Sequence, residues 1–136
     1  MNRLFFNPFT GQFFKLIARR KPRKAPVDAR VEALRAQAKR ELPPRLAALA
    51  AQHGFTYNKV FIKNNVSNWG SCSSLKNINL NLRLVTLPQE LQDYVILHEL
   101  CHLRYLNHGK EFHALLESVC PGHRQLASRM KEYKIR

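Results

Sequence analysis

Residues 93–103 read Asp-Tyr-Val-Ile-Leu-His-Glu-Leu-Cys-His-Leu, and this stretch decides the expected fold. It is apolar on nearly every side, which is typical of a helix buried in the interior. His98 and His102 are four residues apart, so on a helix they project from the same face and can bind one metal ion together. Glu99 is offset by about 100° around that helix, so it is poorly placed as a ligand but can reach a water on the metal. Two imidazoles beside a carboxylate are the minimal set for metal-assisted hydrolysis.

A hydrolytic zinc site has three protein ligands and leaves the fourth position to water. We expect His108 to be the third ligand. On a continuous helix His108 would face about 240° away from His102, so the helix must end before it. Asn107 and Gly109, residue types that tolerate left-handed backbone, predict a turn that returns His108 to the metal. The alternatives for the third ligand lie on the next expected helix and are Glu111, His113 and Glu117.

Length and composition indicate one globular domain: the chain has 136 residues, of which 45% are hydrophobic. Its three cysteines are an odd number and widely spaced, which suits a reducing compartment better than a disulfide framework. Cys101, between the two helical histidines, is expected to pack in the core. No apolar run predicts a membrane span or a secretory signal. We therefore expect a cytoplasmic protein.

The charge distribution predicts affinity for polyanions. The formal net charge is +14, and residues 1–27 contain seven Lys or Arg and no acidic residue. A balance this basic favours association with nucleic acid or another polyanion, here through the N-terminal segment. No zinc finger, RNP motif or P-loop accompanies the charge.

The N-terminal segment, residues 1–27, is expected to lie outside the main domain, residues 28–136. Two Phe-rich runs within residues 3–17 flank a Pro/Gly turn and predict a β-hairpin. Residues 19–26 are basic, contain two prolines and predict a linker.

The main domain is expected to mix helices with a few strands. Asp28 can cap a helix that runs to about Glu41, where the pair Pro43-Pro44 is expected to interrupt it. A second helical segment, about 44–53, should end at Gly54. Trp69 is expected to pack in the core, within a polar turn region. The remaining predicted elements are a strand at 59–63, this turn region at 65–74, a strand at 78–84, and helices from Pro88 onward, at 110–119 and at 123–133.

The order of motifs along the chain carries a family resemblance. Trp-Gly-Ser-Cys-Ser at 69–73, Ile-Asn-Leu-Asn-Leu-Arg-Leu at 78–84, the stretch at 93–103, Asn-His-x-x-x-Phe at 107–112 and a later proline follow one another. This combination resembles the YgjP-like metallopeptidase domain family of bacteria, predicted metal-dependent hydrolases related to the SprT-like zincins. The resemblance spans about residues 28–134. The chain departs from it in having a shorter N-terminal β region and His113 where the family often has Trp.

The resemblance implies an α+β, zincin-like fold, with a small sheet packed on the active-site helix and further helices on its N- and C-terminal sides. By motif position it implies His98, His102 and His108 as Zn²⁺ ligands and Glu99 as the catalytic base.

The leading functional prediction is a zinc metallopeptidase that cleaves polypeptides with a metal-bound water activated by Glu99. The strand at 78–84 could pair with an extended substrate. Candidate residues for stabilising the oxyanion are Asn81, Arg104, Tyr105 and His113. Two alternatives stay open: a metal-dependent nucleotide pyrophosphatase, and a nucleic-acid-associated, SprT-like protein that acts on DNA-bound proteins.

Overall fold

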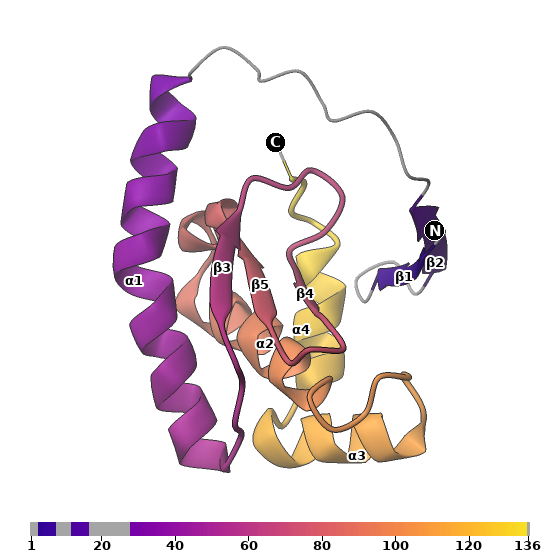
Figure 1. Cartoon of the computed structure of the whole chain (residues 1–136). Helices are drawn as coiled ribbons and strands as arrows, with labels where there is room; N and C mark the ends of the chain where they lie inside the picture. Colours follow the sequence, from indigo (N-terminus) through magenta and orange to yellow (C-terminus); the bar gives the residue numbers. More distant parts are fainter. Residues whose placement is uncertain (1–2, 8–11, 17–27, 136) are drawn as a thin grey trace.

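A computed structural model describes residues 3–7, 12–16 and 28–135 of the chain (Figure 1). Strands β1 (Arg3–Asn7) and β2 (Gln12–Leu16) pair antiparallel, with Phe5 opposite Phe14. This confirms the predicted N-terminal hairpin. The expected linker at 19–26 lies outside the described residues, and the division of the chain at residue 27 stays a prediction.

The long helix α1 (Ala29–His53) begins and ends where the sequence predicts. The Asp28 side chain accepts a hydrogen bond from the Arg30 amide at 2.9 Å, and Gly54 closes the helix in the left-handed conformation with φ 74°. The predicted interruption is wrong, because α1 continues through Pro43 and Pro44. Apolar side chains on one face of the helix are buried in the core both before and after the prolines, and this packing keeps the helix continuous. The buried residues of α1 are Ala38, Leu42, Leu46, Leu49 and Ala50.

A sheet of three strands lies beside α1: β3 (Val60–Lys63), β4 (Gly70–Cys72) and β5 (Ile78–Asn81). Its order is β3-β5-β4, with β5 parallel to β3 and antiparallel to β4. Ile78 and Leu80 point to the buried face, as their period-two spacing requires. β3 confirms a predicted strand. The prediction of a turn region at 65–74 is wrong at Gly70–Cys72, which form β4, although Trp69 is buried as predicted.

The strand expected at 78–84 ends early, at Asn81. The Asn81 side chain accepts a hydrogen bond from the Arg83 amide at 2.9 Å and starts a short 3-10 helix, η1 (Leu82–Thr86). Because the chain turns here, Arg83 is buried along with Leu82 and Leu84, whereas a continuing strand would place it on the opposite face from the two leucines. β5 is the central strand of the sheet, so both of its edges are already paired with neighbouring strands.

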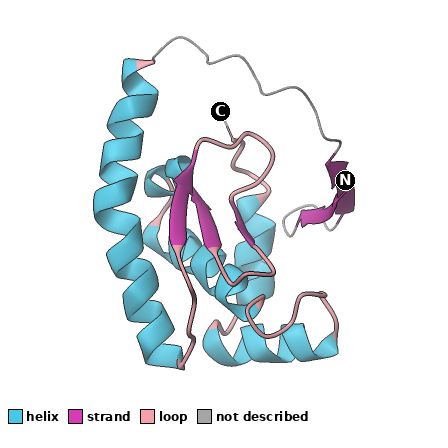
Figure 2. Ribbon diagram, viewed as in Figure 1, coloured by secondary structure: helices cyan, strands magenta, loops and turns pink. Residues whose placement is uncertain are grey.

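Three further helices complete the domain: α2 (Gln89–Cys101), α3 (Lys110–Val119) and α4 (His123–Met130) (Figure 2). All three match predicted helices, with α4 ending earlier than expected. α2 runs behind the sheet, in contact with β4 and β5, and α1 and α4 also pack on it (Figure 1). The structure thus confirms the predicted α+β class, with a small sheet on a buried central helix.

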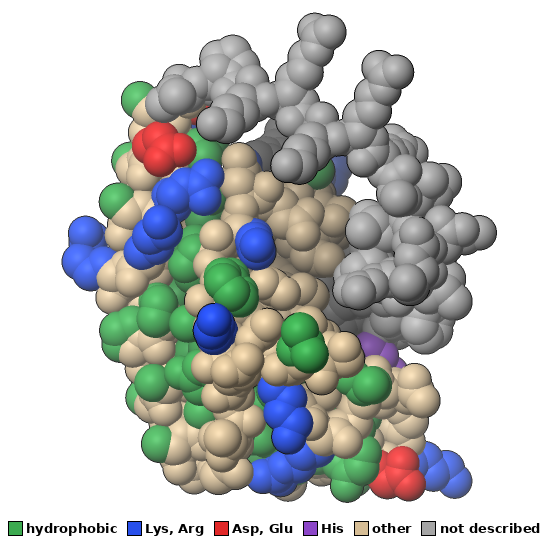
Figure 3. All heavy atoms as spheres, viewed as in Figure 1, with side chains coloured by type: hydrophobic (Ala, Val, Ile, Leu, Met, Phe, Trp, Pro, Cys, Tyr) green, Lys and Arg blue, Asp and Glu red, His purple; other side chains and the backbone are tan. Residues whose placement is uncertain are grey.

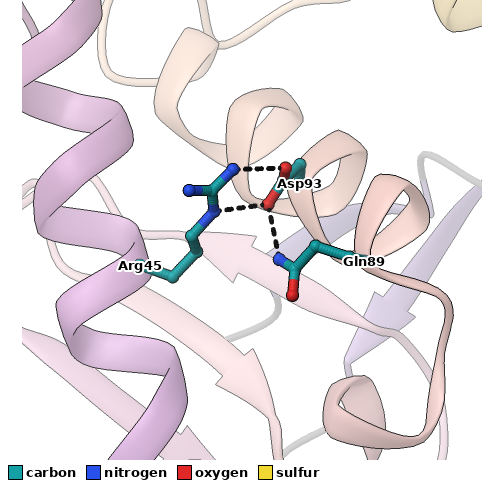
Figure 4. A network of polar contacts seen from close by, with 3 residues as sticks. All are labelled: Arg45, Gln89 and Asp93. Atoms are coloured by element: carbon teal, nitrogen blue, oxygen red, sulfur yellow. Dashed lines mark hydrogen bonds and ion pairs between the residues drawn. The ribbon is translucent and has the colours of Figure 1, made fainter.

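An ion pair joins α1 to α2 (Figure 4). The Arg45 guanidinium donates to both carboxylate oxygens of Asp93, at 2.8 and 2.6 Å, and the Gln89 amide donates to the same carboxylate at 2.9 Å. The bidentate geometry fixes the register of the two helices. No helix in the described part of the chain is long and apolar enough to cross a membrane.

Candidate metal centre

Helix α2 carries two of the expected metal ligands. His98 is 3% exposed, and His102, the residue that ends the helix, is 9% exposed. Their ring centroids lie 5.0 Å apart, as expected for side chains one helical turn apart. Glu99, between them, is 1% exposed.

A tight turn after α2 brings His108 back to the same place. The Arg104 and Tyr105 amides both donate to the Cys101 carbonyl and close a last turn after His102, and the chain then bends at residues 106–107 before His108. The left-handed backbone expected at Asn107 and Gly109 is wrong. In the described residues Lys76 is the only non-glycine with positive φ, and Gly109 is extended at φ −83° and ψ −169°.

The three histidines form one group of candidate ligands. One ring nitrogen from each of His98, His102 and His108 lies within 4.8 Å of the other two. No other cluster of three or more potential metal ligands occurs among the described residues. The expected alternatives Glu111, His113 and Glu117 are not in it. Glu117 instead accepts a hydrogen bond from the His123 ring at 2.6 Å.

The spacing of these nitrogens fits a metal ion. The Nε2 atoms of His98 and His108 are 3.2 Å apart. Two imidazole nitrogens bound to one tetrahedral zinc, each at about 2.0–2.1 Å, would be about 3.3 Å apart. His102 Nδ1 lies 3.0 Å from the Tyr105 carbonyl, which can only accept, so Nδ1 carries the proton and Nε2 keeps its lone pair.

The protonation states also suit a cation. Burial is the main cause that lowers the pKa of His98, His102 and His108, with neighbouring histidines adding to it at His98 and His108. The pKa of His108 falls to about 3. All three rings are therefore neutral near pH 7, which is the form that binds metals.

Glu99 is buried against strand β4. A Cβ placed on Gly70 would lie 3.0 Å from Glu99 Cγ and 3.1 Å from its Oε2, so the strand and the carboxylate are in direct contact. Glu99 Oε2 has no hydrogen-bond partner among the described residues, and burial raises the pKa of the group to about 8. A buried carboxylate oxygen with no partner is costly unless a ligand or cation supplies one.

Two residues of this site, Phe112 and Gly70, have no role predicted from the sequence. Phe112, fully buried on α3, stacks on His102 at a centroid distance of 4.6 Å and also contacts the rings of His98 and His108. It forms an apolar wall behind the three imidazoles. Gly70 is the second of these residues. A glycine within a strand often marks a site where another group approaches the backbone closely.

The fold and this site define a class, the metallopeptidase-like hydrolases. A family profile described as the YgjP-like metallopeptidase domain matches residues 14–133. The chain belongs to that family, which confirms the resemblance in its motifs.

A solved structure has a similar fold. It is described as the metallopeptidase zymogen of Pyrococcus abyssi abylysin, is 24% identical, and superposes with a TM-score of 0.57 over 75% of this chain and 93% of that one. This likeness shows the zincin-like α+β fold. Among curated proteins no relative matches.

Proposed function

We propose that this protein is a zinc-dependent peptidase whose metal is held by His98, His102 and His108 and whose general base is Glu99. One observation carries the proposal: three imidazoles meet at one point beside a buried carboxylate. Membership of a metallopeptidase-domain family supports the hydrolytic class and implies a metal. The three free cysteines are consistent with the predicted cytoplasmic location.

The donor set favours zinc. Three imidazoles with an open fourth position are a common ligand set of catalytic zinc sites, whereas calcium and magnesium prefer oxygen ligands. Zinc bound there would acidify a water molecule and polarise a carbonyl group. Phe112 would keep the ligand side of the site dry, which strengthens electrostatic interactions within it.

Glu99 would move the proton. It accepts a proton from the attacking water and delivers it to the leaving amine. Its raised pKa belongs to the site without a cation. A dication within a few ångströms favours the ionised carboxylate that a base requires.

The substrate is proposed to be an extended polypeptide lying along β4. The predicted docking strand, β5, has no edge to offer, because it pairs with β3 and β4. β4 is an edge strand of the sheet and contacts Glu99 at Gly70. A peptide added to this edge by main-chain hydrogen bonds would pass next to the metal.

Among the four candidates for stabilising the oxyanion, we favour His113. It is exposed on α3, with its ring centroid 6.5 Å from that of His108. Arg104 is engaged elsewhere: its guanidinium donates to the Gly54 carbonyl and stacks on an aromatic ring. Asn81 is buried in hydrogen bonds to the loop before β4. The Tyr105 backbone carbonyl contacts His102, and its exposed side chain stays a second candidate.

The test compares Glu99→Gln with His98→Ala. The protein is loaded with zinc and incubated with a labelled unfolded polypeptide. Glu99→Gln should keep stoichiometric zinc and lose turnover by about 100-fold or more, whereas His98→Ala should lose both. Glu111→Gln, an exposed glutamate at the start of α3, is the matched control and should keep both.

Three outcomes would contradict the proposal. Full activity of Glu99→Gln would remove the base assignment. Release of pyrophosphate from nucleoside triphosphates without peptide cleavage would favour the nucleotide pyrophosphatase. Cleavage of a polypeptide only when it is bound to DNA would favour the SprT-like alternative.

A further inference from the structure

The sheet has a second face that α2 does not cover. α2 packs on the face formed by Ile78, Leu80 and their neighbours. The register places Phe61, Asn79 and Ser71 in one row across the three strands, on the opposite face. We call this the outer sheet face and define it by Lys59, Phe61, Lys63, Ser71 and Asn79.

The outer sheet face belongs to a part of the chain with no acidic side chain. Residues 42–89 contain no Asp or Glu. Lys59 and Lys63 are both exposed, and neither forms an ion pair with an acidic group among the described residues. Figure 3 looks onto this side of the molecule: Lys and Arg side chains are spread over it, and acidic ones are visible only near its margins. The positive charge of this face is therefore uncompensated.

An exposed aromatic ring sits in the middle of this basic face. Phe61 is 40% exposed, and the ammonium group of Lys63 lies 5.1 Å from the centroid of its ring. Lys59 and Lys63 flank it at positions two residues away on each side, so their Cα atoms are about 13 Å apart. Ser71 and Asn79, hydrogen-bonded to each other at 3.1 Å, continue the surface with polar groups.

We propose that the outer sheet face binds single-stranded nucleic acid, with a base stacked on Phe61 and backbone phosphates paired with Lys59 and Lys63. An aromatic platform between cations is the arrangement by which single strands are bound without strong sequence preference. A double helix keeps its bases stacked internally and offers none to Phe61. An acidic protein or an anionic lipid surface would match the charge and could cover the ring, but neither requires a π-face at residue 61, which the Phe61→Leu variant tests. The site is separate from His98 and Glu99 and does not depend on hydrolysis.

The experiment measures fluorescence anisotropy of labelled deoxythymidine and uridine oligomers with the full chain. Phe61→Ala should weaken binding by roughly 5-fold to 150-fold, the range expected for loss of one base–aromatic stack. Phe61→Trp should bind at least as tightly as the unchanged protein. Phe61→Leu keeps an apolar side chain without a π-face and should bind as weakly as Phe61→Ala. The affinities for deoxythymidine and uridine strands should depend on residue 61 in the same way, because base stacking does not involve the sugar.

The lysines are tested by salt dependence. The double variant Lys59→Ala/Lys63→Ala should reduce the slope of log affinity against log salt by about 1.4, at about 0.7 per phosphate contact. The matched control is Lys39→Ala/Arg40→Ala, which removes two exposed charges from α1. This control variant should keep the phosphate contacts of the sheet, so most of the slope of log affinity against log salt should remain.

The proposal is overturned by any of four results: no binding by the full chain, wild-type affinity of Phe61→Ala, equal loss in the sheet and control double variants, or equally tight binding of duplex DNA. The first result would exclude the site, and the other three would assign the binding to general polyanion attraction, including that of residues 1–27. Circular dichroism and thermal melting confirm that each variant is folded.

Discussion

Gly70 has no side chain, and this allows β4 to lie directly on Glu99. A Cβ at this position would be 3.0 Å from Glu99 Cγ and 3.2 Å from the Asn79 carbonyl, both closer than ordinary contacts. Gly70→Ala must therefore displace the proposed base or the strand. We expect a loss of about 1–3 kcal/mol in the free energy of unfolding, together with reduced hydrolytic activity. Urea unfolding and a peptidase assay measure the two effects.

Gly109→Ala is the control for this prediction. Its backbone has negative φ, and the nearest atom to an added Cβ is a carboxylate oxygen of Glu111 at 4.0 Å. Stability should stay within about 0.5 kcal/mol of the unchanged protein. Equal behaviour of the two alanine variants would show that the contact between Gly70 and Glu99 is not tight.

Zinc affinity should distinguish His108, the proposed third ligand, from its neighbour His113. His108 lies within the three-histidine group, whereas His113 lies outside it and is exposed. His108→Ala should lower zinc affinity by more than the roughly 10-fold to 100-fold cost of removing a supporting residue. His113→Ala should keep the metal and change only turnover. Competition with a fluorescent zinc chelator measures both, and a normal affinity for His108→Ala would return the assignment to Glu111, His113 or Glu117.

Spacing explains which parts of the site can be predicted from sequence. The helical period fixes the relation of His98 to His102, so four residues of separation are enough to pair them. His108 depends on a turn, and the predicted reversal occurs although its expected left-handed residues do not. Phe112 reaches the site through the packing of α3 on α2, and no local pattern contains that information.

At the level of elements, α1 shows tertiary packing overriding a local rule. A proline inside a helix removes a hydrogen bond to the carbonyl four residues earlier and costs about 3 kcal/mol or more. The helix continues because Leu42, before the prolines, and Leu46 and Leu49, after them, are all buried in the same core. The sequence shows both the prolines and the leucines, but it does not show which effect is larger.

Pro44→Ala tests whether α1 is continuous in solution. Pro44 is exposed, so its replacement disturbs little packing and restores an amide donor to the Arg40 carbonyl. We expect an increase of about 1–3 kcal/mol in the free energy of unfolding, read from the denaturant midpoint. Pro121→Ala, between α3 and α4, is the control and should give no such gain. An unchanged midpoint for Pro44→Ala would indicate two helices separated by a break.

The short strands were harder to predict than the helices for a physical reason. β4 has only three residues, Gly-Ser-Cys, and none of them has a high strand propensity. Its place is fixed by pairing with β5, where Ser71 lies opposite Asn79. β5 ends at Asn81 because a side-chain cap starts η1, although the apolar alternation continues to residue 84.

For the whole molecule, a bound metal would add a cross-link between α2 and the loop before α3. Two proposed ligands end α2, the third lies in the loop before α3, and Phe112 of α3 packs on all three rings. The polar tie between α1 and α2, from Arg45 to Asp93, is partly exposed and contributes at most about 1 kcal/mol. Bound zinc would therefore contribute more to stability than this ion pair.

Removing the metal should lower the thermal stability of the whole domain. A ligand that binds only the folded state at 1,000 times its Kd stabilises it by about 4 kcal/mol, which corresponds to a Tm increase of roughly 10 °C for a domain of this size. Thermal melts should show this increase when zinc is added to chelator-treated protein. Magnesium, which prefers oxygen ligands, should give none. His102→Ala should melt at the same temperature with and without zinc. Equal melting of the unchanged protein in both conditions, with no zinc retained, would leave the three histidines as core residues without a metal.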